Sequence, residues 1–484
     1  MTLPANIRNR VLRLGMSLIF LTGMLVVLGS RKDAHSQEIG DVNRPGSGSQ
    51  QDYFSGSSSS PPAIIVRSRA DSSVMNASSQ EPELVARPLI DQSIASQPVF
   101  EEDGNWFIDL DTGYTSQMLD FQNRQGDKEV ILLEQSFLNG GQMGLTIGAQ
   151  FRASGLFAQT NRTGKFSYFG RFPTDFSGNS ASDFRLLHAN QSVSAHFNPM
   201  VHGYFETLFS DVFSFGDFKQ GSFQVRQAYV VFGDLSRSPY YAFIGKKNLS
   251  FGSMGTLSPF SQAIPWHYFG ALAEGAGIGF DNQRLNATIT ALNGSRGIRV
   301  VDSDEKGHLN NFAANVLLRT PLQGEDQFDI GAGYLHGTIY NAPVAEHLDP
   351  TLFGPNNGAF DINAALKLGR LQLAGEYVQT VNPWPATEHE VIAYRAEAAY
   401  DMFIGDMAAR SSVSWSEGIQ GSSETEFEFN RQLVLGLSVQ PYPNTTLTFE
   451  YVRGSGFAPL TGIQKVSDKD VVQDSLVLGA VISL

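Results

Sequence analysis

The run Met143-Gly-Leu-Thr-Ile-Gly-Ala-Gln-Phe-Arg-Ala153 alternates apolar side chains at its odd positions with small or polar side chains at its even positions. Successive side chains of a β-strand point to opposite faces, so this run predicts a strand with one apolar and one polar face. The same alternation recurs along the chain to Leu484. The sequence therefore predicts an all-β protein.

The connections between the alternating segments carry a second signal. Short connections, such as 198–200, alternate with mostly longer ones, such as 248–273. Short turns on one rim and long loops on the other are typical of outer-membrane barrels, so we expect a transmembrane antiparallel β-barrel of about 16 strands over residues 141–484. The expected strands are 143–157, 183–197, 201–216, 222–232, 240–247, 274–281, 284–293, 310–320, 327–339, 359–368, 371–381, 390–400, 406–416, 428–439, 444–454 and 472–484.

A soluble β-sandwich or propeller is the alternative fold for such strands. A sandwich has no need to alternate its loop lengths around the whole chain. A propeller would show an internal repeat of roughly 40 to 50 residues, and the sequence has none. The membrane barrel is therefore the favoured fold class.

The N-terminal region is expected to fall into three parts. Residues 1–36 have the layout of a signal peptide, with basic residues before the apolar stretch Leu14–Leu28 and small residues at Ala34 and Ser36. A membrane anchor is the alternative, but that stretch is short for a span of about 20 residues. Residues 37–100 are rich in Ser and Pro and are expected to be a disordered periplasmic segment. Residues 101–140 are a lead-in segment.

Composition excludes several classes of function. The chain has no Cys and a formal net charge of −14. The absence of Cys excludes thiolate chemistry. The negative net charge argues against a nucleic-acid binder, which needs a basic surface. The sequence lacks the common linear motifs of hydrolases, phosphate-binding loops and zinc peptidases. We therefore expect no enzyme activity, no cofactor and no metal; a barrel-borne hydrolase, whose catalytic pairs need no linear motif, is a less favoured alternative.

If the apolar face meets lipid, the other face lines a lumen. A small-anion channel would need a run of Arg or Lys there, whereas the expected lining charges are six basic and six acidic residues, which predicts a hydrated, mixed wall. The alternative is that these groups are only solvated and weakly paired. The expected pore-lining residues are Arg152, Glu206, Arg226, Arg319, Asp329, Asp361, Lys367, Glu376, Arg395, Glu397, Arg410 and Glu450.

The stretch Phe223–Gly252, which reads FQVRQAYVVFGDLSRSPYYAFIGKKNLSFG, resembles paired strands and the following loop of outer-membrane porins. It is most similar to the siderophore-porin family and more distantly similar to phosphate-selective porins. The resemblance implies uptake of an iron chelate and a homotrimer. Leu484 departs from the terminal aromatic residue that such barrels usually carry.

The connection from Asn248 to Ala273 holds the position that resembles the inward-folded constriction loop of porins. It contains no Asp, Glu, Lys or Arg, so it is unsuited to sieve ions by charge. Its rings either stack against a bulky solute or pack the loop against the wall. The expected constriction residues are Phe251, Phe260, Trp266, His267, Tyr268 and Phe269.

Three histidines are expected on the lumen face. The turn after Phe197 sets His196 opposite His202, and His188 lies on the same face. A facing pair could bind a transition metal, but no third ligand is evident, so ordinary lumen histidines are favoured.

These observations predict an exported outer-membrane porin that admits small polar solutes, including an iron-siderophore chelate. Its expected partners are outer-membrane lipid, a small-molecule solute and further copies of itself in a homotrimer. The alternatives are a structural outer-membrane anchor with a periplasmic tether, a phosphate- or anion-selective porin, or a barrel-borne hydrolase.

Overall fold

The computed structural model describes residues 98–101, 106–167, 177–210, 214–215, 218–219, 223–294, 297–301, 309–342, 354–457 and 468–484. All of them belong to one compact unit, Pro82–Leu484. The expected signal peptide and nearly all of the Ser/Pro-rich segment lie outside the described residues. None of the helices in the described ranges is both long and apolar enough to cross a membrane.

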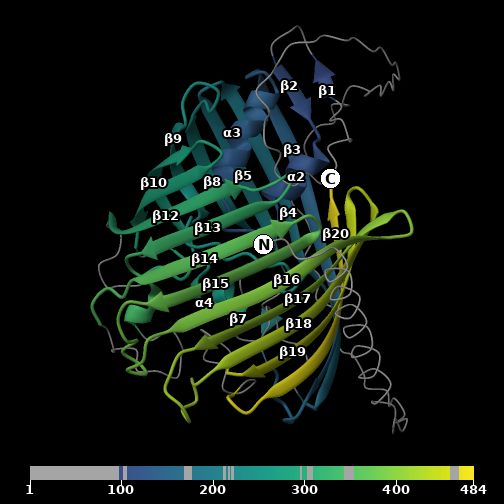
Figure 1. The fold of residues 1–484 in the computed structure, drawn as a ribbon, viewed down its shortest axis with the longest axis vertical. Helices are drawn as coiled ribbons and strands as arrows, with labels where there is room; N and C mark the ends of the chain where they lie inside the picture. Colours follow the sequence, from purple (N-terminus) through teal and green to yellow (C-terminus); the bar gives the residue numbers. More distant parts are fainter. Residues whose placement is uncertain are drawn as a thin grey trace, which may run out of the picture. The chain divides into compact units, whose positions relative to one another are not determined.

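Sixteen strands form a closed antiparallel barrel, which confirms the predicted fold class (Figure 1). Each strand pairs with the next in chain order, and β20 pairs with β3 from Gln473↔Thr160 to Ser483↔Gln150, which closes the ring. Closure pairs both edges of the sheet and leaves no open edge. The strands are β3 (Met143–Thr160), β4 (Ser180–Asn198), β5 (Val201–Phe209), β8 (Phe223–Gly233), β9 (Tyr240–Asn248), β10 (Leu272–Asp281), β11 (Leu285–Asn293), β12 (Leu309–Pro321), β13 (Gln327–Leu335), β14 (Ala359–Leu368), β15 (Leu371–Thr380), β16 (Ile392–Ile404), β17 (Met407–Ile419), β18 (Asn430–Tyr442), β19 (Thr445–Gly456) and β20 (Val472–Ser483).

The alternation in the sequence sorts side chains between the two faces of the barrel wall. In β14, Ile362 is 55% exposed on the outside, whereas the adjacent Asn363 is 8% exposed on the inside. The outward apolar positions recur around the barrel, as at Ile244, Ile278 and Leu478. Such an apolar outer surface around a polar interior is what a lipid-embedded barrel requires.

Two of the predicted strands end at least four residues earlier than expected. The segment predicted at 201–216 ends at Phe209, and Ser214–Phe215 (β6) instead forms a separate small hairpin with Phe218–Lys219 (β7). The segment predicted at 327–339 ends at Leu335, and a 3₁₀ turn follows at Ile339–Asn341. The reason in the second case is that the Asn311 side chain bonds both backbone groups of Gly337, which removes them from the sheet.

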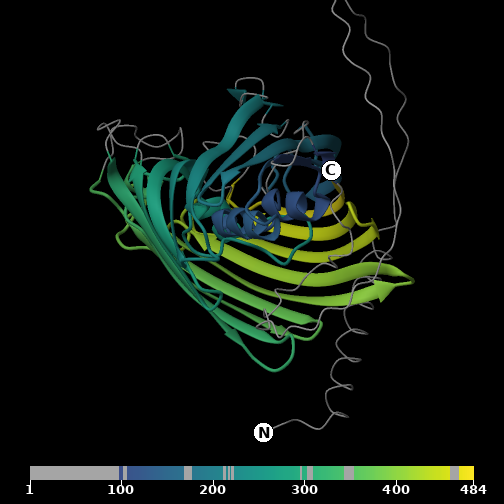
Figure 2. The same ribbon diagram turned by 90° about the horizontal axis from the view of Figure 1, so that it is seen from above.

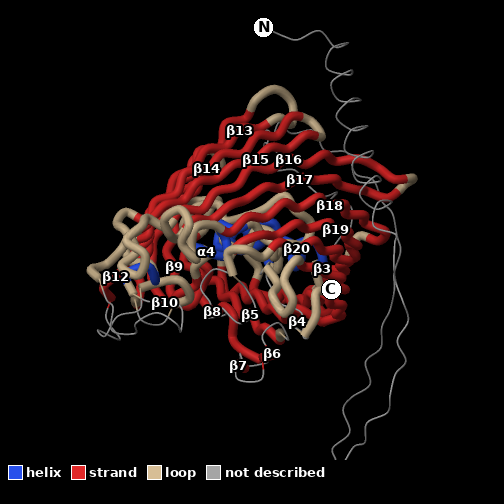
Figure 3. Tube along the Cα trace, turned by 90° about the horizontal axis from the view of Figure 1, so that it is seen from below, coloured by secondary structure: helices blue, strands red, loops and turns tan. Residues whose placement is uncertain are grey.

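Further elements precede the barrel in the chain. They are β1 (Pro98–Glu101), β2 (Trp106–Asp109), α2 (Thr112–Met118) and α3 (Lys128–Leu138). β2 pairs parallel with the start of β3, from Trp106↔Met143 to Asp109↔Thr146. Figures 2 and 3 show the helices within the ring of strands rather than outside it. We call residues 106–142 the N-terminal segment.

Candidate functional site in the barrel lumen

The connection between β9 and β10 folds into the barrel. Its base is closed by the Leu249 amide, which donates to the Ala271 carbonyl at 2.9 Å. It contains the short helix α4 (Ile264–Phe269), with Pro265 in the first turn, where its missing N–H is tolerated. We call residues 249–271 the inward loop. Its position inside the ring (Figure 3) is the one that the sequence resemblance implied.

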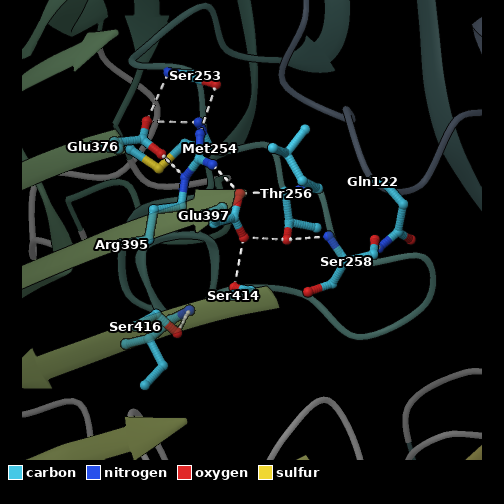
Figure 4. Close-up of polar contacts among 12 residues, drawn as sticks. Gln122, Ser253, Met254, Thr256, Ser258, Glu376, Arg395, Glu397, Ser414 and Ser416 are labelled. Carbon is cyan, nitrogen blue, oxygen red and sulfur yellow. Dashed lines mark hydrogen bonds and ion pairs between the residues drawn. The ribbon is translucent and has the colours of Figure 1, made fainter. Parts of the chain in front are cut away.

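Three carboxylates of the barrel wall accept hydrogen bonds from backbone amides of the inward loop. Glu376 accepts from the amides of Ser253 and Met254 at 2.8 and 2.7 Å (Figure 4). Glu397, on the next strand, accepts from the Leu257 amide at 2.9 Å and from the Thr256 hydroxyl at 2.6 Å.

Glu450 on β19 holds the far part of the loop in the same way. It accepts from the Phe260 amide at 2.8 Å and from the Ser261 hydroxyl at 2.6 Å. Hydrogen bonds to a charged group contribute about 1.5–3 kcal/mol each. The loop is therefore fixed along the wall from β15 to β19 by directional bonds.

Arg395 on β16 links two of these carboxylates. Its Nε donates to Glu376 at 2.7 Å, and it forms a second ion pair with Glu397. A third donor reaches the Ser253 hydroxyl at 3.1 Å, so the same guanidinium touches the loop (Figure 4). Buried charges are stable only when paired and bonded in this way.

Glycines on the wall make room for the loop. A Cβ at Gly479 on β20 would lie 2.4 Å from the Phe260 ring, and one at Gly436 on β18 would lie 2.4 Å from Pro259. No real Cβ approaches other atoms so closely. The wall and the loop are therefore matched in shape as well as in bonding.

Most of the predicted constriction residues are buried in packing contacts rather than exposed to the lumen. Five of the six are at most 5% exposed, and only Trp266 is partly exposed. Tyr268 and Phe269 belong to an apolar cluster with Tyr340 and Trp384. The geometry favours the interpretation that these rings anchor the loop. The packed residues are Phe251, Phe260, His267, Tyr268 and Phe269.

The N-terminal segment occupies another part of the lumen. Thr115 of α2 packs against Gly148 of β3, where a Cβ would lie 2.2 Å from the threonine hydroxyl oxygen. The Tyr114 hydroxyl bonds Ser194 of β4 at 2.6 Å. The helices share an apolar cluster with inward side chains of β5, β8 and β9, which are Tyr204, Tyr229, Val231, Tyr241 and Phe243.

One buried ion pair joins the N-terminal segment to the wall. Glu129 of α3 is fully buried and pairs with Lys247 of β9. Apart from this pair, most of the contact between the helices and the wall is apolar. The segment is thus attached differently from the inward loop.

The N-terminal segment and the inward loop also bond to each other. The Gln125 side chain donates to both carbonyls at the base of the loop, Leu249 at 3.0 Å and Ala271 at 2.9 Å. The Gln122 side chain donates to the Ser258 carbonyl at 3.0 Å, and Gln262 donates back to the Phe121 carbonyl. Together they form one assembly inside the barrel.

The predicted pore-lining residues fall into three groups. Glu376, Arg395, Glu397 and Glu450 hold the inward loop, and Asp361 lies beneath Gly252 of that loop. Arg152, Glu206 and Arg226 are buried against the N-terminal segment and the loop base. The others lie nearer the short turns and are more exposed; they are Arg319, paired with Asp281, Lys367, paired with Glu325, Arg410, paired with Asp401, and Asp329, bonded by Gln327.

The predicted histidine pair is present as neighbours in the wall. His196 and His202 are register partners, and their Nδ1 atoms are 3.1 Å apart. His188 lies elsewhere, against the Phe121 ring and 3.4 Å from Arg124. Within the described ranges, no three His, Cys, Asp or Glu side chains are grouped so that they could hold a metal ion.

Sequence reasoning missed the residues of the N-terminal segment that reach the lumen, Phe121, Gln122, Arg124 and Gln125. One signal could have revealed them. β8 and β9 carry large apolar side chains on both faces, such as Tyr241 and Phe243 inside and Ile244 outside. A strand between lipid and water has only one such face, so two apolar faces indicate that something covers the inside.

Comparisons with known proteins give the following. No protein-family model and no curated protein matches the chain. The chain is similar to the outer-membrane channel DcaP of Acinetobacter baumannii, with 12% identity over 70% of this chain and 98% of that one and a TM-score of 0.49. It is also similar to an anion-selective porin from Comamonas acidovorans (11%, 71% and 100%, TM-score 0.47) and to OprB of Pseudomonas putida (7%, 75% and 98%, TM-score 0.48). At such low values function must be argued from the geometry of this chain.

Proposed function

We propose that this protein is a channel of the bacterial outer membrane that passes small polar solutes through a restricted lumen. The observation that carries the proposal is a closed sixteen-strand barrel with an apolar outer face, whose polar interior holds an inward loop bonded to the wall. A barrel of this strand number can enclose an aqueous lumen. The inward loop then narrows that lumen without blocking it.

The polar groups near the short turns support passage of water and solute. Lys367, Arg410 and Asp401 lie on the inner wall and are partly exposed. Such a mixed set of charges keeps a passage hydrated and favours neither cations nor anions strongly. Outside, lipid covers side chains such as Ile278, which is 62% exposed.

Planar-bilayer recording tests this function. Purified full-length protein is expected to produce discrete conductance steps in potassium chloride. Denatured protein at the same concentration is the control for detergent leakage. Absence of steps from protein that shows a β-rich spectrum and a heat-dependent shift of gel mobility would contradict the channel.

A structural anchor is the second candidate, and the N-terminal segment favours it by filling part of the lumen. In that case the barrel would be a plugged membrane attachment. The same recording separates the two, because an anchor predicts a folded protein without conductance.

Passage of an iron chelate, a homotrimer and the lack of enzyme activity remain predictions. A reduction of the ion current by an added ferric chelate would test passage of the chelate. Chemical cross-linking in detergent would test the second.

A further inference from the structure

Three arginines from distant parts of the chain meet where the N-terminal segment reaches the inward loop. Arg124 and Arg152 both lie over the Phe121 ring, with their guanidinium carbons 3.5 and 4.3 Å from its centre. Arg226 of β8 donates to the Asn248 side chain at 3.4 Å, and that side chain donates to the Arg124 carbonyl. We call Arg124, Arg152 and Arg226 the arginine cluster.

The arginine cluster lies beside His188, which is the register partner of Arg152 and whose Nδ1 is 3.4 Å from Arg124. All three guanidinium groups act electrostatically on the His188 imidazole. Arg152 and Arg226 are buried, at 4% and 8% exposed, and Arg124 is partly exposed. Burial, together with the neighbouring Arg226, lowers the pKa of Arg124 well below its usual value. Holding three positive charges so close together is therefore costly.

The described residues offer these three charges no ion pair. No carboxylate of the described chain lies within ion-pair distance of any member of the cluster. Asp120, Glu206 and Glu450 act on the cluster electrostatically without forming an ion pair with it, and Glu206 already accepts from Gln227 at 2.7 Å. The Nε of Arg152 is buried without a hydrogen-bond partner. Lys128 adds a further positive charge nearby.

We propose that the arginine cluster binds an oxyanion group, a carboxylate or a phosphate, of a small solute inside the barrel. Guanidinium groups present forked donors that match two oxygens of such a group. An unneutralised buried charge is costly, and a bound anion removes that cost. The neighbouring rings of Phe121 and Trp266, 5.9 Å apart, would offer an apolar surface to the rest of the solute. The passage of such a solute rests on the proposed channel function, whereas the binding does not.

The sequence predicts a lumen wall of mixed charge because it contains no run of basic residues. The cluster forms only in three dimensions, from one loop of the N-terminal segment and two strands. Arg124, Arg152 and Arg226 lie 28 and 74 positions apart in the sequence. The charge of the lumen is thus mixed overall and basic at this one place.

Calorimetry on the full-length protein in detergent tests the site directly. Sodium benzoate and sodium phosphate are the probes, and benzamide is the neutral match to benzoate. We expect at least one of the two anions to bind and benzamide not to bind. Replacing Arg226 by Gln should weaken that binding by about tenfold or more, since a charge-assisted bond is lost. Arg453→Gln, on the outer face, should leave it unchanged.

Several results would overturn the site. They are no binding of either anion, equal binding of benzamide, and equal binding by the Arg226→Gln variant. A failed fold is recognised by loss of the heat-dependent gel shift, and Arg226→Lys then replaces Arg226→Gln, with weaker binding expected. Bilayer recording is run in parallel: anion binding without conductance would leave the site standing and refute the channel, while conductance without anion binding would do the opposite.

Discussion

The inward loop and the N-terminal segment both lie inside the barrel, but they are attached in opposite ways. The loop presents backbone amides to the carboxylates Glu376, Glu397 and Glu450. The helices of the N-terminal segment present mainly apolar side chains to the apolar inner faces of β5, β8 and β9, with one buried ion pair, Glu129–Lys247, and one hydrogen bond between Tyr114 and Ser194.

This difference has a consequence for stability. Directional bonds to buried charges fail abruptly when a partner is lost, because the remaining group stays buried and unsatisfied. Apolar contact is lost in proportion to the area exposed. We therefore expect the loop to be a fixed part of the wall and the N-terminal segment to be the part that can be displaced.

Replacing Gly148 by Leu should displace the N-terminal segment and produce the largest effect on current. A side chain there collides with Thr115, while the outer face of β3 is untouched. Single-channel conductance should rise several-fold in planar bilayers.

Gly155→Leu is the matched control for that variant. Gly155 lies on the same strand, and a Cβ there has only ordinary contacts at 3.9 Å. Its conductance should equal that of the wild type. A similar rise in both variants would show that displacement of the segment is not the cause.

The same substitution against the inward loop should act differently. In Gly479→Leu the new side chain meets the Phe260 ring, but Glu450 still holds the adjacent amides. The collision should lower the yield of folded, heat-modifiable barrel by overpacking, which costs about 1–3 kcal/mol. A normal yield with raised conductance would mean that the loop moves as easily as the N-terminal segment.

Removing one loop carboxylate should have a smaller effect. Glu450→Gln keeps the shape but weakens the bonds from Phe260 and Ser261, each worth about 1.5–3 kcal/mol with a charged acceptor. Open-channel current noise should increase without a change in the mean conductance as large as in Gly148→Leu. Glu417→Gln, which alters a carboxylate bonded to Tyr394 and Arg431 rather than to the loop, should leave the noise unchanged.

The smallest effect is expected for Trp266→Ala. Trp266 is partly exposed and touches Phe121 of the N-terminal segment, with ring centres 5.9 Å apart. A ring contact contributes about 0.5–1.5 kcal/mol beyond the area it buries, so conductance should rise only slightly. A rise as large as that of Gly148→Leu would place the main restriction at this ring instead.

The strands could be predicted because the alternation of faces is written directly in the sequence. Ile362 and Asn363 illustrate it, since each lies on the face that its polarity predicts. The attachment of the loop could not be predicted, because the donors to Glu376 and Glu450 are backbone amides, which every residue carries. The charge pattern showed that these glutamates face inward and did not show what they bind.

The arginine cluster and the N-terminal segment escaped prediction for a different reason. Arg124, Arg152 and Arg226 come together only because the barrel closes and the chain before it turns inward. The helices α2 and α3 span only seven and eleven residues, too short for a strong periodic signal. The apolar inner faces of β8 and β9 were the local trace of their presence.

The most direct test of the central claim is the single-channel conductance of a variant lacking residues 98–142, compared with wild type in the same bilayers. If the barrel is a channel partly filled by its own N-terminal segment, the shortened protein should show the heat-dependent gel shift of a closed barrel and a several-fold larger conductance. A variant lacking residues 37–97 serves as the control and should conduct like the wild type. Equal conductance in all three proteins, with the barrel intact, would contradict the account.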